Sequence, residues 1–173
     1  MIPMADIKFN DYSVEVIAAL KELAYRAVEE SCGELESQVK RNSPVGENNG
    51  SGLKNSWQHR VSQKGSETTG TVGSPLERSI WIEFGTGSYA LKGNGRQGYW
   101  VYVDDGQTGK SSRSTKSYTL KEAKRAVAIM RKKGLNAYYS NGIKPQRPFW
   151  KAYSSLKNKL IRHMQDIFKG GMA

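Results

Sequence analysis

The longest regular hydrophobic pattern in the chain lies between residues 12 and 40. Apolar and small side chains recur there mostly at spacings of three and four, at Val14, Ile17, Leu20, Ala24, Ala27, Val28, Leu35 and Val39. This spacing predicts a long amphipathic helix that lies across one face of a sheet. Pro44 is expected to end the helix, because the residue before a proline disfavours helical backbone angles.

Four short β-prone runs follow, at residues 53–61, 68–72, 79–84 and 99–103, separated by Gly, Ser and Pro. Runs of this kind predict an antiparallel meander. Its buried face is expected to carry Trp57, Val61, Ile80, Ile82, Phe84, Trp100 and Tyr102. The loop at residues 44–52 is rich in turn-forming residues and is predicted to be mobile.

A second helix is predicted to begin after Thr119, because Thr119 and Glu122 have the spacing of a capping box. Gly134 is placed to end it in a left-handed conformation. The stripe expected to face inward consists of Leu120, Ala123, Val127 and Met130. Residues 135–140 can then return beside residues 99–103 as a second strand.

The strand, helix and second strand form an insertion of about residues 88–144 within a single domain spanning residues 1–173. After it, the spacing of Phe149, Tyr153, Leu156, Leu160, Met164 and Ile167 predicts a C-terminal amphipathic helix. The predicted fold class is therefore α+β: long N-terminal and C-terminal helices packed on an antiparallel meander, with an inserted strand–helix–strand unit.

Charge is distributed unevenly along the chain, whose formal net charge is +11. Residues 1–40 carry four basic and eight acidic side chains, whereas residues 106–147 carry eleven basic and one acidic. Such a basic block attracts DNA or an acidic partner. The candidate contact residues are Lys121, Lys124, Arg125, Arg131, Lys132 and Lys133. A merely solvated helix face is the alternative interpretation.

A glycine pattern that resembles a dinucleotide-binding fingerprint occurs at Gly93, Gly95 and Gly98. That fingerprint requires a strand before it and a helix after it, so that the helix N-terminus meets the pyrophosphate. Here the last glycine leads directly into the β-prone run at residues 99–103. The pattern is therefore interpreted as a turn, and no nucleotide site is predicted.

Other candidate chemistry is sparse. His59 and His163 have no neighbouring side chains at metal-ligand spacing, and Cys32 is expected to be a small, half-buried hydrophobe within a helix. Glu83 is the main carboxylate available for acid–base chemistry, but it has no evident partner. No catalytic residue, cofactor or metal is predicted. The longest apolar runs have about five residues, so no membrane span is expected.

Three segments are interpreted as architectural, because each places proline or glycine where a predicted helix or strand begins or ends. They are Ser43-Pro44-Val45 followed by Gly52, Leu53 and Ser56; then Glu83-Phe84-Gly85-Thr86-Gly87; and finally Pro148-Phe149. In this order and at this spacing they resemble the neck or tail-completion family of tailed bacteriophages, whose members join the head to the tail or finish the tail's upper end.

The resemblance implies a structural virion protein at the head–tail junction, in a neck, tail-completion or tail-terminator role, and not an enzyme. It implies a homo-oligomeric ring, six-fold if it lies on the tail side, with other neck and tail proteins as partners and packaged DNA as a further contact. The protein would be made in the host cytoplasm and end in the virion.

The alternative is a free nucleic-acid-binding protein that acts through residues 106–147. In that hypothesis the aromatic side chains Tyr99, Trp100, Tyr102, Tyr138 and Tyr139 stack on bases beside the basic helix. Core packing is the more ordinary role for aromatic residues of a sheet.

Overall fold

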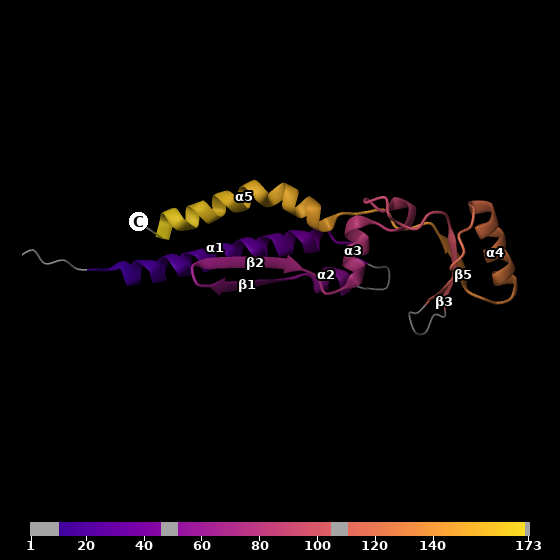
Figure 1. The fold of residues 1–173 in the computed structure, drawn as a ribbon, viewed down its shortest axis with the longest axis horizontal. Helices are drawn as coiled ribbons and strands as arrows, with labels where there is room; N and C mark the ends of the chain where they lie inside the picture. Colours follow the sequence, from indigo (N-terminus) through magenta and orange to yellow (C-terminus); the bar gives the residue numbers. More distant parts are fainter. Residues whose placement is uncertain (1–10, 46–51, 105–110, 172–173) are drawn as a thin grey trace, which may run out of the picture.

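The computed structural model describes residues 11–45, 52–104 and 111–171, and Figure 1 shows their arrangement. The elements, in chain order, are α1 (Ser13–Asn42), α2 (Gly52–Ser56), β1 (Gln58–Lys64), β2 (Glu67–Gly73), α3 (Glu77–Phe84), a 3-10 turn (Gly87–Tyr89), β3 (Trp100–Asp104), β4 (Ser111–Arg113), α4 (Leu120–Lys132), β5 (Ala137–Ser140) and α5 (Pro148–Gly171). The predicted α+β class is confirmed.

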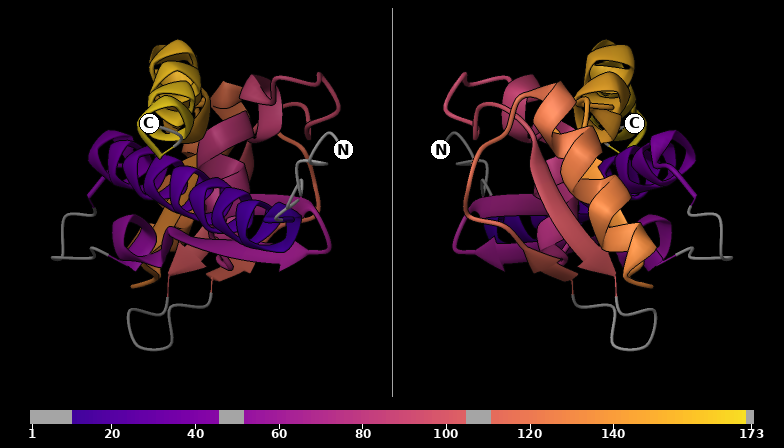
Figure 2. Two further views of the ribbon diagram at one scale, coloured as in Figure 1. Left: turned by 90° about the vertical axis from the view of Figure 1, so that its left-hand side faces the viewer. Right: turned by 90° about the vertical axis from the view of Figure 1, so that its right-hand side faces the viewer.

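The molecule is elongated and has two parts (Figure 1). We call α1, α2, the β1–β2 hairpin, α3 and α5 the body, and β3, β4, α4 and β5 the insertion lobe. Within the body, α1 runs between the hairpin on one side and α5 on the other, as the views along the molecule also show (Figure 2). The insertion lobe forms the far end of the molecule, away from the N-terminal end of α1.

The expected N-terminal helix is confirmed as α1, which ends just before Ser43. Its buried face meets the other elements of the body at Val39, which is fully buried with Trp57 and Ala152. Phe149 packs against this cluster, and its ring lies 6.2 Å from that of Trp57. The first turn of α5 is therefore fixed against the last turns of α1.

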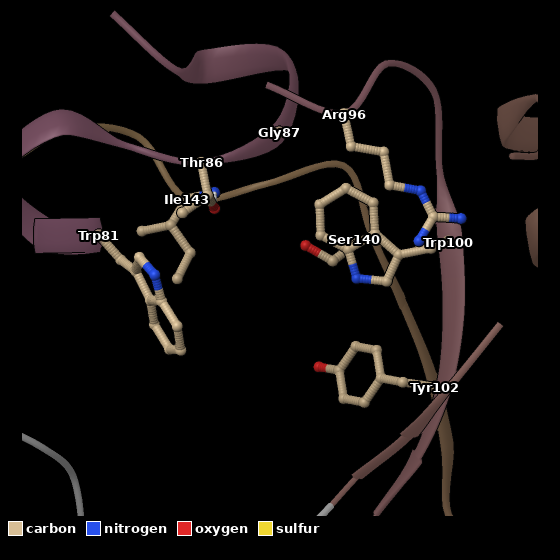
Figure 3. A pocket seen from close by; sticks show the side chains of 8 residues that line it. All are labelled: Trp81, Thr86, Gly87, Arg96, Trp100, Tyr102, Ser140 and Ile143. Carbon is tan, nitrogen blue, oxygen red and sulfur yellow. Dashed lines mark hydrogen bonds between the residues drawn. The ribbon is translucent and has the colours of Figure 1, made fainter. Parts of the chain in front are cut away.

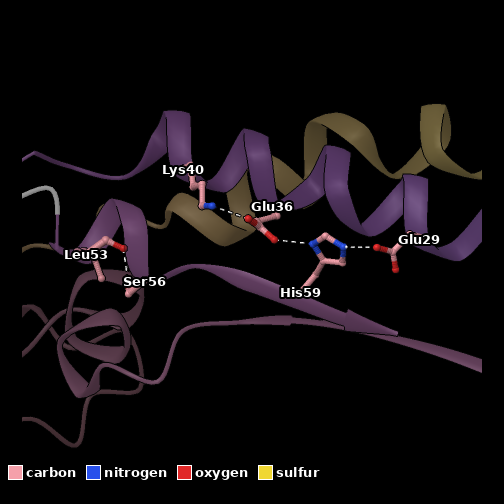
Figure 4. Close-up of polar contacts among 6 residues, drawn as sticks. All are labelled: Glu29, Glu36, Lys40, Leu53, Ser56 and His59. Atoms are coloured by element: carbon pink, nitrogen blue, oxygen red, sulfur yellow. Dashed lines mark hydrogen bonds and ion pairs between the residues drawn. The ribbon is translucent and has the colours of Figure 1, made fainter. Parts of the chain in front are cut away.

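A polar clamp joins the hairpin to α1 at His59 on β1 (Figure 4). Its Nδ1 lies 2.5 Å from Oε2 of Glu36, and its Nε2 lies 3.1 Å from Oε1 of Glu29. Hydrogen bonds to Glu36 and then Glu29 raise the pKa of His59 above its ordinary value. Burial tends to raise the pKa of Glu36, but hydrogen bonds from Lys40 and His59 outweigh it and hold this pKa below its ordinary value.

The insertion lobe has a small core of its own. Its three-stranded antiparallel sheet has the order β4-β3-β5, and α4 covers one face through Val101, Ala123, Val127 and Ala137. The pairing of residues 135–140 with residues 99–103 is confirmed, since β5 pairs with β3. The capping box of Thr119 and Glu122 is present, and Gly134 has a φ of 78°.

The expected strand at residues 79–84 is wrong, because these residues lie in α3. Alternation of apolar residues indicated a strand, but the helix places Ser79 and Glu83, four residues apart, together on its buried side. Ile80 and Phe84, expected to be buried, are 57% and 47% exposed. The buried side of α3 is therefore polar, and its apolar residues are more exposed.

The expected strand at residues 53–61 is partly wrong, since it begins as α2 and becomes β1 only at Gln58. The Ser56 hydroxyl donates to the carbonyl of Leu53 (2.7 Å) and supports the helical turn. The expected single meander is instead two separate sheets, β1–β2 and β4-β3-β5.

Two details of the insertion lobe also differ from expectation. Val101, not Trp100 or Tyr102, is the buried residue of β3, because Val101 points towards α4 and its neighbours point to the opposite face. Leu120 is 41% exposed because it begins α4 at the edge of the lobe. The expected mobility of the loop at residues 44–52 concerns mainly residues 46–51, which lie outside the described residues, as does Lys110.

The clamp predicts a specific dependence of stability on pH. Because the pKa of His59 is raised in the folded state, its contribution to the free energy of unfolding is fully present below about pH 6.5. That contribution is lost as the pH rises through the folded-state pKa of His59. Conversely, the contribution of Glu36 is lost as the pH falls through its lowered pKa. In urea unfolding between pH 6 and 9, His59→Gln should remove part of the decline in stability of the wild type, whereas Gln58→Ala should retain it. An unchanged profile in His59→Gln would contradict the clamp.

Candidate interaction surfaces

The three architectural segments meet at one end of the body, where α1, α2, α3 and α5 come together. Glu83 is the central residue. Its carboxylate is buried and accepts hydrogen bonds from the backbone N–H groups of Phe149 (2.9 Å) and Trp150 (3.0 Å). It therefore caps the N-terminus of α5, whose first N–H groups have no partner within the helix. This assigns Glu83 a structural partner that the sequence alone did not reveal.

Gly85, Thr86 and Gly87 carry the chain from the body into the insertion lobe. The backbone N–H of Thr86 donates to the carbonyl of Ile143 (3.0 Å), and its hydroxyl accepts from the N–H of Ile143 (3.0 Å). Gly85 and Gly87 have φ values of 72° and 59°, and a Cβ at either would collide with backbone oxygens of this crossing. Gly85 follows the helix α3 and not the strand expected at residues 79–84.

The first segment closes α1 and starts α2. The Ser43 hydroxyl donates to the carbonyl of Val39 (2.8 Å). Leu53 is buried, whereas Val45 is 61% exposed. The remaining residues of the segment contact other parts of the body. Pro44 is half-buried, and Gly52 lies against Arg78 of α3. The Ser56 hydroxyl lies 2.7 Å from that of Ser74.

The third segment begins α5 as expected, with Pro148 as its first residue and Phe149 packed into the core. The side-chain amide of Asn42, the last residue of α1, donates to the carbonyl of Pro148 (3.2 Å). The first and third segments and Glu83 therefore hold the elements of the body together, whereas Gly85, Thr86 and Gly87 form the crossing to the insertion lobe.

A groove of about 480 Å³ separates the body from the insertion lobe (Figure 3). Trp81 of α3 and Ile143 form one wall, and Trp100 and Tyr102 of β3 form the other. Among the residues that line the groove, Arg96 is the one with a charged side chain. Its guanidinium donates to the carbonyls of Ser114, Thr115 and Lys116 and lies 5.2 Å from the Trp100 ring, so the cation is held in place.

The six candidate basic residues of the insertion lobe lie on or just after α4. Lys121, Lys124, Arg125, Arg131, Lys132 and Lys133 are all exposed. Arg131 is partly engaged, because its Nε donates to the carbonyl of Ala137 (2.9 Å) and its guanidinium lies over Tyr138. Lys121, Arg125 and Lys132 share the helix face opposite the buried Ala123 and Val127. This face can contact a polyanion without rearrangement of the lobe.

The histidines, the cysteine and the glycine pattern have structural surroundings in the described residues. Within the part of the chain that the structure describes, no group of three His, Cys, Asp or Glu side chains could hold a metal. Gly98 leads into β3, so the glycine pattern lacks the helix that a dinucleotide site needs. His163 pairs with Glu30 (2.8 Å), and burial raises the pKa of the half-buried Cys32 thiol. No described helix is long and apolar enough to cross a bilayer.

Taken together, these features define an α+β protein whose notable surfaces are an aromatic groove and an exposed basic helix face. Residues 7–85 match the model of a family described as "Bacteriophage HK97-gp10, putative tail-component". The expected resemblance to a phage structural family is thus confirmed over these residues, as a match to a tail-component family. Comparison with curated proteins gave no match, and comparison with solved structures gave none either.

The capping role of Glu83 had one usable signal in the sequence. The residues before α5, Gln146 and Arg147, supply no Ser, Thr, Asp or Asn cap, and the first turn of α5 has no acidic residue. A helix that starts in the core without a local cap requires an acceptor from elsewhere.

Replacing Glu83 by Gln should lower the free energy of unfolding by about 1–3 kcal/mol, because the amide offers one acceptor where two backbone N–H groups require one each. Denaturant unfolding measures this. The matched control is Glu67→Gln on the exposed edge of β2, which should change stability by less than about 0.5 kcal/mol. Equal effects of the two variants would refute the cap.

Proposed function

We propose that the protein is a structural component of the head–tail junction of a tailed phage, in a neck, tail-completion or tail-terminator role, and that it assembles as part of a ring. The observation that carries the proposal is the family match over residues 7–85, which covers α1, the hairpin and α3. The described residues of the three architectural segments are engaged in packing and in helix capping.

The shape and the charge distribution add support. An elongated molecule with an acidic N-terminal segment and a basic insertion lobe presents different surfaces at its two ends. A closed ring requires such a heterologous contact, in which one surface of a subunit meets a different surface of the next. The basic lobe is then available for packaged DNA or for an acidic neighbouring ring.

Light scattering and virion analysis test this function. The purified protein, alone or mixed with the proteins encoded beside it, should form a species with the mass of a closed ring, six-fold if it sits on the tail side. Phage that lack the protein should accumulate unjoined heads and tails, and the protein should be found in completed wild-type virions. Its absence from virions would reject the proposal.

The exposed basic face of α4 supports a second candidate, nucleic-acid binding through the insertion lobe. If this is the principal activity, the isolated protein should bind DNA with a steep dependence on salt. The variant Lys121→Glu/Arg125→Glu/Lys132→Glu should then lower the log–log salt slope by about three, or roughly one for each lost phosphate contact. The control Lys151→Glu/Lys157→Glu/Lys169→Glu, on exposed positions of α5, should leave the slope unchanged.

A further inference from the structure

The β1–β2 hairpin is a two-stranded sheet, and no described strand pairs with either of its outer edges. Its strands have seven residues each and pair without interruption, from Gln58 with Gly73 to Lys64 with Glu67. The clamp at His59 places α1 on one face of this sheet. Both edges of the sheet are left without a neighbouring strand.

The turn of the hairpin decides which backbone groups lie on these edges. Gly65, with a φ of 64°, and Ser66 form a two-residue turn, which makes the flanking residues a hydrogen-bonded pair. Bonded and non-bonded pairs then alternate along the antiparallel ladder. The N–H and C=O groups that point outward therefore belong to His59, Val61 and Gln63 on β1, the β1 edge, and to Thr68, Gly70 and Val72 on β2, the β2 edge. None of these groups bonds to a described residue.

The edge strand β5 of the insertion lobe is, by contrast, blocked by contacts within the chain. The carbonyl of Ala137 accepts a hydrogen bond from Nε of Arg131 (2.9 Å), and its N–H donates to the carbonyl of Leu135 (2.9 Å). Edge strands that remain unpaired usually carry such a block, a bulge, a proline or a lysine. β2 has no bulge, proline or lysine, and its sequence Glu-Thr-Thr-Gly-Thr-Val-Gly is rich in β-branched residues. The β2 edge is therefore suited to pair with another strand.

Charge selects the strand that fits the β2 edge. His59 faces α1, so the exposed side chains of Arg60 and Lys64 project from the opposite face of β1. Glu67, also exposed, projects from that same face of β2. Two β1 edges side by side would bring basic strands together, and two β2 edges would leave both β1 edges bare. A β2 edge against a β1 edge leaves neither bare, and full overlap places Glu67 opposite Lys64 of the second copy.

The dimensions of the hairpin allow this pairing to repeat. Two strands occupy about 9.6 Å across a sheet, which lies within the roughly 8–10 Å between the axes of packed helices. In full overlap, the residues that face α1 in one copy lie beside those that face α1 in the next. The α1 helices then share one face of the extended sheet, each over its own hairpin.

We propose that the β2 edge pairs antiparallel with the β1 edge of a second copy of this chain. The hairpins of successive copies then form one continuous antiparallel sheet. Each copy uses a different edge on each of its two neighbours, which is the head-to-tail arrangement that closes into a ring. This inference rests on the proposed ring and identifies the contact that builds it.

Hydrogen exchange of alternate backbone amides tests the contact. The oligomer is labelled in heavy water, quenched, dissociated and read by NMR, and the monomer at low concentration is compared. The outward amides of His59, Val61, Thr68 and Gly70 should exchange at least about tenfold more slowly in the oligomer, because each gains a hydrogen bond. Thr69, whose N–H already bonds within the hairpin, is the control and should change much less.

A matched pair of substitutions at Thr68 isolates its N–H group. Thr68→Pro and Thr68→Ala both remove the hydroxyl that lies 3.0 Å from the side-chain amide of Gln63, but only the proline removes the N–H. Because this N–H points away from β1, the hairpin ladder keeps its hydrogen bonds in both variants. Thr68→Pro should lower the association constant at least about tenfold, whereas Thr68→Ala should stay within about threefold of the wild type. Thermal unfolding of both is recorded in parallel, and if Thr68→Pro fails to fold, the exchange pattern decides.

The inference is overturned if the wild type forms no oligomer, or if the β1 amides stay unprotected in the oligomer, which would mean that β2 pairs with a different strand. Equal association of a folded Thr68→Pro and Thr68→Ala would overturn it as well. These results are distinct from failure of the proposed function. A ring found in virions without protection of these amides would reject this contact and leave the junction role standing, whereas absence of the wild type from virions would reject the role itself.

Discussion

The body of this protein depends on one buried carboxylate. Glu83 comes from the middle of the chain, yet it accepts the first backbone N–H groups of α5, which follow the entire insertion lobe. Without it, those N–H groups would lie beside the core with no acceptor, a costly arrangement in a low-dielectric interior. The cap lies beside the packing of Phe149 on Trp57 and the contact of Asn42 with Pro148, and together these contacts hold the first turn of α5 against α1.

Local signals in the sequence predicted much of the fold. The spacing of three and four in α1 and α5, the capping box at Thr119 and the left-handed Gly134 each describe a short-range requirement that the surrounding structure does not override. The conformation of α3 could not be predicted in this way. Its apolar residues alternate as in a strand, but the segment is a helix that presents Glu83 to the first N–H groups of α5, a contact with a distant part of the chain.

Of the candidate surfaces, the basic face of α4 could be predicted from the sequence, and the groove could not. The basic residues of α4 could be assigned from composition, and they are exposed. The groove could not, because Trp81 and Trp100 come together only through the crossing of the chain at Thr86 and Ile143. Likewise, the stripe of α1 looks uniform in the sequence, and only the lengths of the hairpin and α5 decide which part of it stays uncovered.

The crossing at Thr86 and Ile143 has a consequence for how such a chain can change over generations. Residues that enter and leave the insertion lobe are hydrogen-bonded neighbours, and the lobe has its own small core. A longer or shorter lobe can therefore be accommodated there without moving the two ends apart, since closing a loop costs little more as its length grows. The length of the lobe can therefore vary at this junction while the geometry of the body is kept.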